Sequence, residues 1–73
     1  MSLNSGQVKK LLETNKPLKF KQLALSLMYT RLKNMYQKDP SASTVDACMK
    51  QLNDLFAKFG GSMNEDYKLA TSI

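Results

Sequence analysis

The segment from Pro17 to Lys38 reads PLKFKQLALSLMYTRLKNMYQK, and its apolar side chains recur with the spacing of a helix. At 100° per residue, five of them share one face within about 60°: Leu18, Leu25, Tyr29, Leu32 and Tyr36. Four more widen the apolar arc to about 200°: Ala24, Leu27, Met28 and Met35. A helix that covers one core needs an arc of about 100°, so we predict a helix over 17–38 with more apolar surface than one neighbour covers.

A shorter helix is predicted on the N-terminal side of this segment, over residues 5–15. Ser5 can cap it, because serine side chains accept hydrogen bonds from the first free backbone N–H groups. One face of the segment carries three apolar residues: Val8, Leu11 and Leu12. Asn15 can end this helix, and Pro17 would then stand in the first turn of the next one, where its missing N–H costs nothing.

A third helix is predicted over residues 43–59. Ser43 and Asp46 stand at the spacing of a capping box. The apolar residues of this segment form a stripe about 120° wide: Val45, Cys48, Met49, Leu52, Leu55, Phe56 and Phe59. Gly60 supplies the left-handed residue that often ends a helix. The narrow stripe indicates packing against a single neighbour.

The fold class that follows from these segments is all-α. Short connections make consecutive helices antiparallel neighbours, so we predict a small three-helix up-down-up bundle in one domain, residues 1–61. For residues 62–73 two alternatives stay open. They form either a short helix, begun by the capping-box pair Ser62 and Glu65, or a mobile tail.

The small size of the chain makes association the expected source of additional stability. The chain has 73 residues, and a core of this size supplies about 3–5 kcal/mol. Cys48 is the sole cysteine, which excludes a disulfide within the chain, and without histidine we expect neither a metal nor a cofactor. We therefore predict a homodimer, a larger helical bundle closed by a two-fold axis. Its predicted interface lies on the helix over 17–38: Leu25, Tyr29, Leu32 and Tyr36.

The residue types argue against an enzyme. Histidine, the commonest general base, does not occur in the sequence. Cys48 stands within the apolar stripe of residues 43–59, where we expect it to act as a small hydrophobic residue and not as a nucleophile. The expected function is that of a non-enzymatic protein–protein interaction or regulatory module.

The net charge of +5 is unevenly distributed and leaves a second function open. Residues 1–38 hold eight Lys or Arg against Glu13 alone, whereas residues 39–73 hold three Lys against five acidic residues. The alternative is a small nucleic-acid-binding protein that contacts phosphates through Lys9, Lys10, Lys16, Lys19 and Lys21. Against it, Arg31 is the single arginine, and the lysines form no continuous stripe along the helix over 17–38. Solvated surface lysines are the favoured interpretation.

Hydropathy and cysteine content bear on location. The longest apolar stretch, Leu23 to Tyr29, is far shorter than the ~20 residues of a membrane-spanning helix. A lone cysteine fits a reducing compartment. We expect a cytoplasmic protein without a membrane partner.

Overall fold

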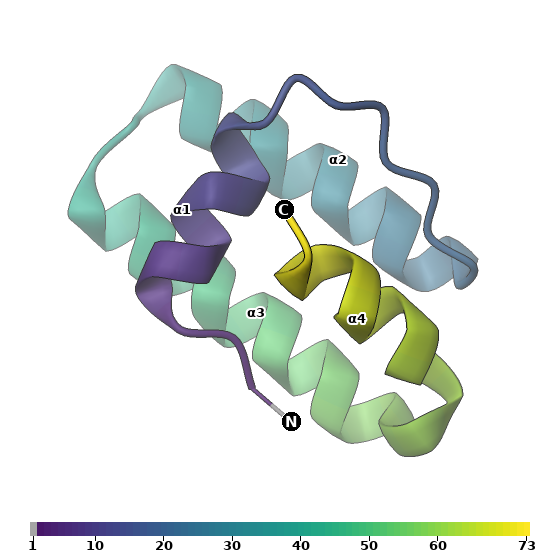
Figure 1. The fold of residues 1–73 in the computed structure, drawn as a ribbon. Helices are drawn as coiled ribbons and strands as arrows, with labels where there is room; N and C mark the ends of the chain where they lie inside the picture. Colours follow the sequence, from purple (N-terminus) through teal and green to yellow (C-terminus); the bar gives the residue numbers. More distant parts are fainter. Residues whose placement is uncertain (1) are drawn as a thin grey trace.

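Helices account for most of residues 2–73, the part of the chain that the computed structural model describes. They are α1 (Ser5–Glu13), α2 (Leu23–Lys38), α3 (Ala42–Phe59), the 3₁₀ turn η1 (Gly60–Met63) and α4 (Asn64–Thr71), all shown in Figure 1. The predicted all-α class is confirmed. Because α3, η1 and α4 follow one another without a break, the C-terminal part of the chain is one helical run that bends at Gly60.

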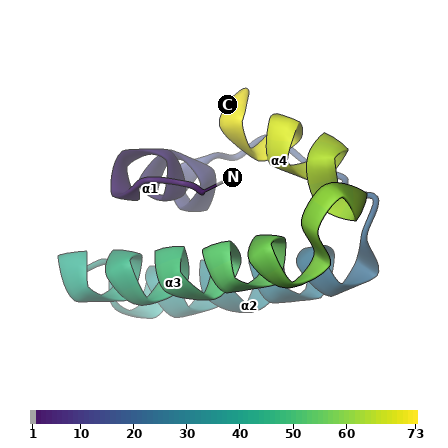
Figure 2. The ribbon, with the colours of Figure 1, turned by 90° about the horizontal axis from the view of Figure 1, so that it is seen from below.

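The helices are arranged in two layers. Figure 2 shows α2 and α3 side by side in one layer, running antiparallel, with α1 and α4 together above them. The side of the α2–α3 pair that α1 and α4 cover is called here the inner face, and the opposite side the outer face. The core lies on the inner face, and its completely or almost completely buried side chains come from both layers: Val8, Leu11, Leu12, Leu25, Cys48, Leu52, Phe56 and Met63.

The predicted up-down-up order holds for α2 and α3 but not for α1, which crosses the pair instead of lying along it (Figure 1). The physical reason is the connection between α1 and α2. Residues 14–22 form a long segment without helix, and a connection of that length does not force its two helices to lie antiparallel. The connection between α2 and α3 spans only residues 39–41, and these two helices do pair as predicted.

The prediction that the second helix begins at Pro17 is wrong, since α2 begins at Leu23. Phe20 explains the difference, because it is buried from the connecting segment and its ring packs edge-on against Tyr29 at 5.4 Å between centroids. Backbone N–H groups at Lys21 and Gln22 meanwhile donate to the carboxylate of Asp66 in α4. These long-range contacts favour an extended chain over residues whose own pattern predicts a helix.

Apart from the start of α2, the helix ends and caps differ from the predicted ones by at most two residues. Asn4, and not Ser5, caps α1 through a reciprocal pair with Gln7: each side chain accepts from the other residue's backbone N–H, at 2.8 and 3.0 Å. Ser41, and not Ser43, caps α3 and accepts from Thr44 N–H at 3.3 Å. Gly60 ends α3 with φ of +56°, the positive value that the sequence predicted.

The N-terminal residues are tied to the far end of the chain. Leu3 and Asn53 exchange two hydrogen bonds, from Leu3 N–H to Oδ1 at 2.6 Å and from Nδ2 to the Leu3 carbonyl at 2.9 Å. The hydroxyl of Tyr67 in α4 donates to the Ser2 carbonyl at 2.9 Å. Of residues 62–73, for which a short helix and a mobile tail were both open, Asn64–Thr71 form α4 and contribute the buried Ala70 to the core. The predicted capping box is wrong, since α4 begins without a side-chain cap and the Ser62 hydroxyl donates to the Phe59 carbonyl.

Candidate protein interface

The four residues predicted as an interface lie in the chain's own core. Leu25, Tyr29, Leu32 and Tyr36 are 0, 8, 2 and 8% exposed and form the inner side of α2. They were predicted as a subunit interface because a tyrosine ring can pack against a partner while its hydroxyl stays in water. Since α1 covers these side chains, they have no surface left to offer a second chain.

Both tyrosine hydroxyls bond to α1 instead of to water. Tyr29 donates to the Leu11 carbonyl at 2.9 Å, and Tyr36 donates to Glu13 Oε2 at 2.8 Å. The hydrogen bond to the Glu13 carboxylate, together with burial, raises the pKa of Tyr36 above its ordinary value of 10.0. These two tyrosines therefore attach α1 to α2, a role within the chain.

The remaining apolar part of α2 faces away from the core. Leu23 is 71% exposed, Leu27 60% and Met35 38%, although all three belong to an ordered helix. At 100° per residue, these positions are turned by about 90° or more from the buried side of α2. Together with two half-buried neighbours they form what is called here the outer strip: Leu23, Leu27, Met28, Met35 and Leu55.

A shallow groove of about 270 Å³ joins the two helices on this face. It is lined by Met28 of α2 and by four residues of α3: Gln51, Asp54, Leu55 and Lys58. Methionine is flexible and polarisable, which suits surfaces that adapt to a partner. Met28 and Leu55 belong both to the outer strip and to the groove, whose other lining residues are polar or charged.

The charges around the outer strip are mostly positive. Arg31 and Lys38 of α2 and Lys58 of α3 accompany a single acidic residue, Asp54. Within residues 2–73 the one ion pair joins Lys21 to Glu65, on the other layer of the molecule. All four charges beside the outer strip are therefore without an ionic partner in the part of the chain that is described.

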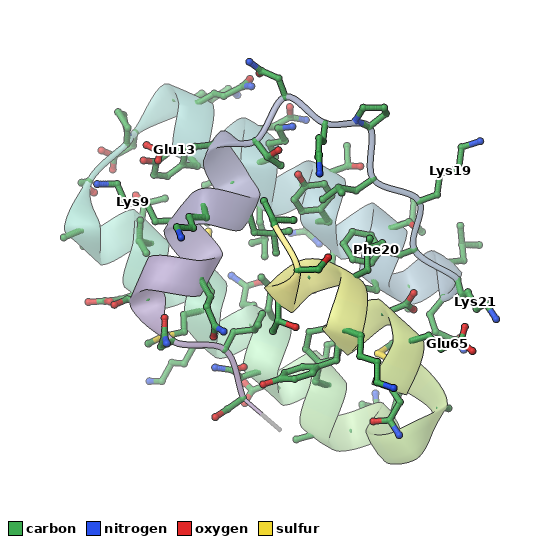
Figure 3. The ribbon with its side chains drawn as sticks, in the orientation of Figure 1. Lys9, Glu13, Lys19, Phe20, Lys21 and Glu65 are labelled. Atoms are coloured by element: carbon green, nitrogen blue, oxygen red, sulfur yellow. The ribbon has the colours of Figure 1, made fainter. Side chains whose placement is uncertain are left out.

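The lysines proposed for nucleic acid do not form one surface. Figure 3 shows Lys9 on one flank of the molecule and Lys19 and Lys21 on the opposite flank. Lys21 is paired with Glu65, which raises its pKa above the ordinary 10.5 through their hydrogen bond and charge attraction. Lys10 lies in the last turn of α1, and Lys16 lies in the connecting segment. The five are exposed but dispersed.

Cys48 lies at the centre of the molecule, where the sequence predicted a small hydrophobic residue. It is 0% exposed, its Sγ lies 4.0 Å from the Leu32 carbonyl, and burial raises the pKa of its thiol. The thiol form therefore predominates at neutral pH, and a thiolate is the form that reacts.

Residues 2–73 hold neither a cluster of metal-ligating side chains nor a helix that could span a membrane. No three His, Cys, Asp or Glu side chains in this range gather as a metal ion would require. None of the helices in the same range has both the length and the apolar character needed to cross a membrane.

Sequence reasoning missed the exposed end of α2, although the signal was present. The arc of about 200° divides into the buried inner side and the exposed Leu27 and Met35, whereas Leu23 lies outside that arc. Leu27 lies at the edge of that arc farthest from the buried residues of α2. A core that packs on the opposite side of the helix does not reach this edge.

Comparison with known proteins gives no further assignment. The chain matches no known family profile, no curated protein and no solved structure.

Proposed function

We propose that this chain is a non-enzymatic protein–protein interaction module that forms a homodimer through the outer strip. The observation that carries the proposal is the exposure of Leu23 and Leu27, at 71 and 60%, one turn apart on an ordered helix. Single exposed leucines are ordinary, but contiguous apolar surface rimmed by charged residues is typical of interaction sites. Met35 and the groove at Met28 extend this surface along α2.

The dimensions of the α2–α3 pair suit a four-helix core. With 16 and 18 residues, the two helices are about 24 and 27 Å long. Two such pairs stacked by their outer faces would form a four-helix bundle with the outer strips inside, and a two-fold axis is the commonest way to close it.

The expected affinity is modest. Covering an exposed leucine or methionine contributes about 1.5–3 kcal/mol, and association itself costs about 4–15 kcal/mol. Leu23, Leu27 and Met35 from each copy therefore predict a dimer that dissociates on dilution, with Kd of about 1 μM or weaker.

Salt dependence separates self-association from nucleic-acid binding. Stacking two outer faces brings Arg31, Lys38 and Lys58 of each copy towards those of the other, with Asp54 as the only compensation. Added salt screens this repulsion, so the dimer is expected to strengthen as salt rises. A complex between the lysines of residues 9–21 and a nucleic acid would instead weaken steeply with salt.

The test is the solution mass of the full chain by light scattering, over a range of protein and salt concentrations. We expect twice the chain mass for the wild type, and a monomer for Leu27→Glu. Asn15→Glu is the matched control, because it adds the same charge at an exposed residue of the connecting segment. A wild type that is monomeric at all concentrations would overturn the proposal, as would a dimer unaffected by Leu27→Glu. A complex with duplex DNA or RNA that dissociates as salt is added would favour the nucleic-acid-binding alternative.

A further inference from the structure

Asp66 of α4 is a buried carboxylate with an unusual pair of partners. It is 2% exposed, and its two oxygens accept backbone N–H groups from the residues that directly precede α2: Lys21 at 2.6 Å and Gln22 at 2.9 Å. Gln22 is the N-cap residue of α2, and its own side chain makes no capping bond. The polar anchor at the start of α2 therefore comes from a residue more than forty positions later in the sequence.

Two further contacts join α4 and η1 to the same two residues. Glu65 pairs with the Lys21 ammonium, and the two side chains meet at the edge of the molecule in Figure 3. The Gln22 side-chain amide donates to the Ser62 carbonyl at 3.3 Å. A carboxylate near a helix N-terminus is also favoured by the helix dipole, so Asp66 suits its position electrostatically.

The rest of α4 is held by packing, and its connection to α3 contains a pivot. An eight-residue helix is marginal on its own, so α4 depends on its contacts. Tyr67 packs edge-on against Phe56 at 5.4 Å between ring centroids. Gly60 has φ of +56°, and the space where a side chain would lie at Gly60 and Gly61 is open. Because glycine adopts a wide range of backbone conformations, this pair is the point of the connection that changes conformation most readily.

We propose that α4 is a clasp that controls the outer strip. While Asp66 is docked, α2 begins at Leu23 and holds Leu23 and Leu27 one turn apart on its outer side. When α4 detaches, Lys21 and Gln22 lose their acceptor and the first turn of α2 frays, so the most exposed part of the outer strip loses its helical order. The effect on dimerisation rests on the function proposed above, whereas the coupling between α4 and α2 does not.

The test uses the full chain with Asp66→Asn, which keeps the side-chain size but turns an amide NH2 group towards one of the two backbone donors. Asp46→Asn is the matched control, because it removes the same charge at an exposed residue of α3. The first readout is backbone hydrogen exchange, residue by residue. In Asp66→Asn we expect exchange at residues 21, 22, 25 and 26, whose N–H groups are hydrogen-bonded at the start of α2, and in α4 to become about tenfold faster, the factor for losing a hydrogen bond to a charged acceptor. Exchange in the middle of α3 should stay at the wild-type rate.

The second readout is the dimer Kd, expected to weaken about tenfold in Asp66→Asn and to stay unchanged in Asp46→Asn. Unchanged exchange at residues 21, 22, 25 and 26 would overturn the inference, as would an equal acceleration over the whole chain. A monomeric wild type with the expected exchange pattern would overturn the proposed function but leave the clasp standing. If Asp66→Asn does not fold, Tyr67→Phe removes only the bond to Ser2 and should accelerate the same two regions to a smaller degree. Acceleration confined to α4 in that variant would overturn the coupling.

Discussion

Both sides of α2 carry leucines, but these leucines have opposite surroundings. The inner side carries Leu25 and Leu32, at 0 and 2% exposed, and the outer side carries Leu23 and Leu27, at 71 and 60%. All four are leucines of one helix, so hydrophobicity does not decide which becomes core. The difference arises because α1, the connecting segment and α4 cover only one face of the α2–α3 pair (Figure 2). Within residues 2–73 no element covers the outer side of α2, so its leucines stay exposed.

The largest expected difference between the two sides of α2 comes from truncating one leucine on each side to alanine. Leu25→Ala should lower the free energy of unfolding by about 2–5 kcal/mol, because it removes a fully buried side chain and leaves a cavity. Leu27→Ala should change it by less than about 0.5 kcal/mol. Urea denaturation followed by circular dichroism, at protein concentrations below the dimer Kd, measures both. Equal losses in the two variants would mean that α2 has no distinct outer side.

A second, smaller effect is expected at Asp66, whose carboxylate accepts two backbone hydrogen bonds at the start of α2. Asp66→Ala should lower the free energy of unfolding by about 1–3 kcal/mol, since two backbone N–H groups lose a charged acceptor in a partly buried place. Asp46→Ala, at an exposed position, should cost less than about 0.5 kcal/mol. Chemical denaturation of the two variants side by side gives the difference, and a loss no larger for Asp66→Ala would remove its anchoring role.

The cover of the inner side can be weakened through the cap of α1. Asn4→Ala removes one half of the reciprocal pair with Gln7 and should lower the free energy of unfolding by about 1 kcal/mol. Ser5→Ala serves as the control, because Ser5 is exposed and does not cap the helix. Thermal melts should therefore rank Asn4→Ala below Ser5→Ala. The reverse ranking would mean that Ser5, the residue predicted from the sequence, caps α1.

The smallest effect concerns pH and the bond between Tyr36 and Glu13. Folding raises the pKa of Tyr36, so this group contributes stability below its ordinary pKa of 10.0 and loses that contribution as pH rises through the higher folded value. Tyr36→Phe cannot ionise and should lack this part of the alkaline decline. The comparison is the slope of stability against pH above 10 for wild type and variant, and identical slopes would contradict it.

The spacing of apolar residues in the sequence was sufficient to predict the helices whose buried residues all lie on one side of the helix. The third predicted helix matches α3 within a residue, because Val45, Cys48, Leu52 and Phe56 repeat on one side and Gly60 ends it. The inner side of α2 was likewise recognisable as a stripe. These features depend on neighbours three and four residues apart, which a sequence displays directly.

Features that depend on distant partners were not recognisable from the sequence. Residues 17–22 have the apolar spacing of a helix but are not helical in the structure. The Phe20 ring packs against Tyr29, and the backbone N–H of Lys21 donates to Asp66. The interface prediction failed for a related reason, since a helical wheel gives the width of an apolar arc but not the part that α1 covers. A width of about 200° was the correct signal, and its division between core and surface is a tertiary property.

The bonds from Ser2 to Tyr67 and from Leu3 to Asn53 also bear on the order of events during synthesis. A chain that leaves the ribosome from its N-terminus can form α1, and later the α2–α3 pair, from local contacts. The first residues, however, have nothing to bind until residues 53 and 67 have emerged. Contacts between such distant residues slow folding relative to a helical bundle of equal size with local contacts only. The contacts between the two ends therefore raise the mean sequence separation that folding of this small chain has to close.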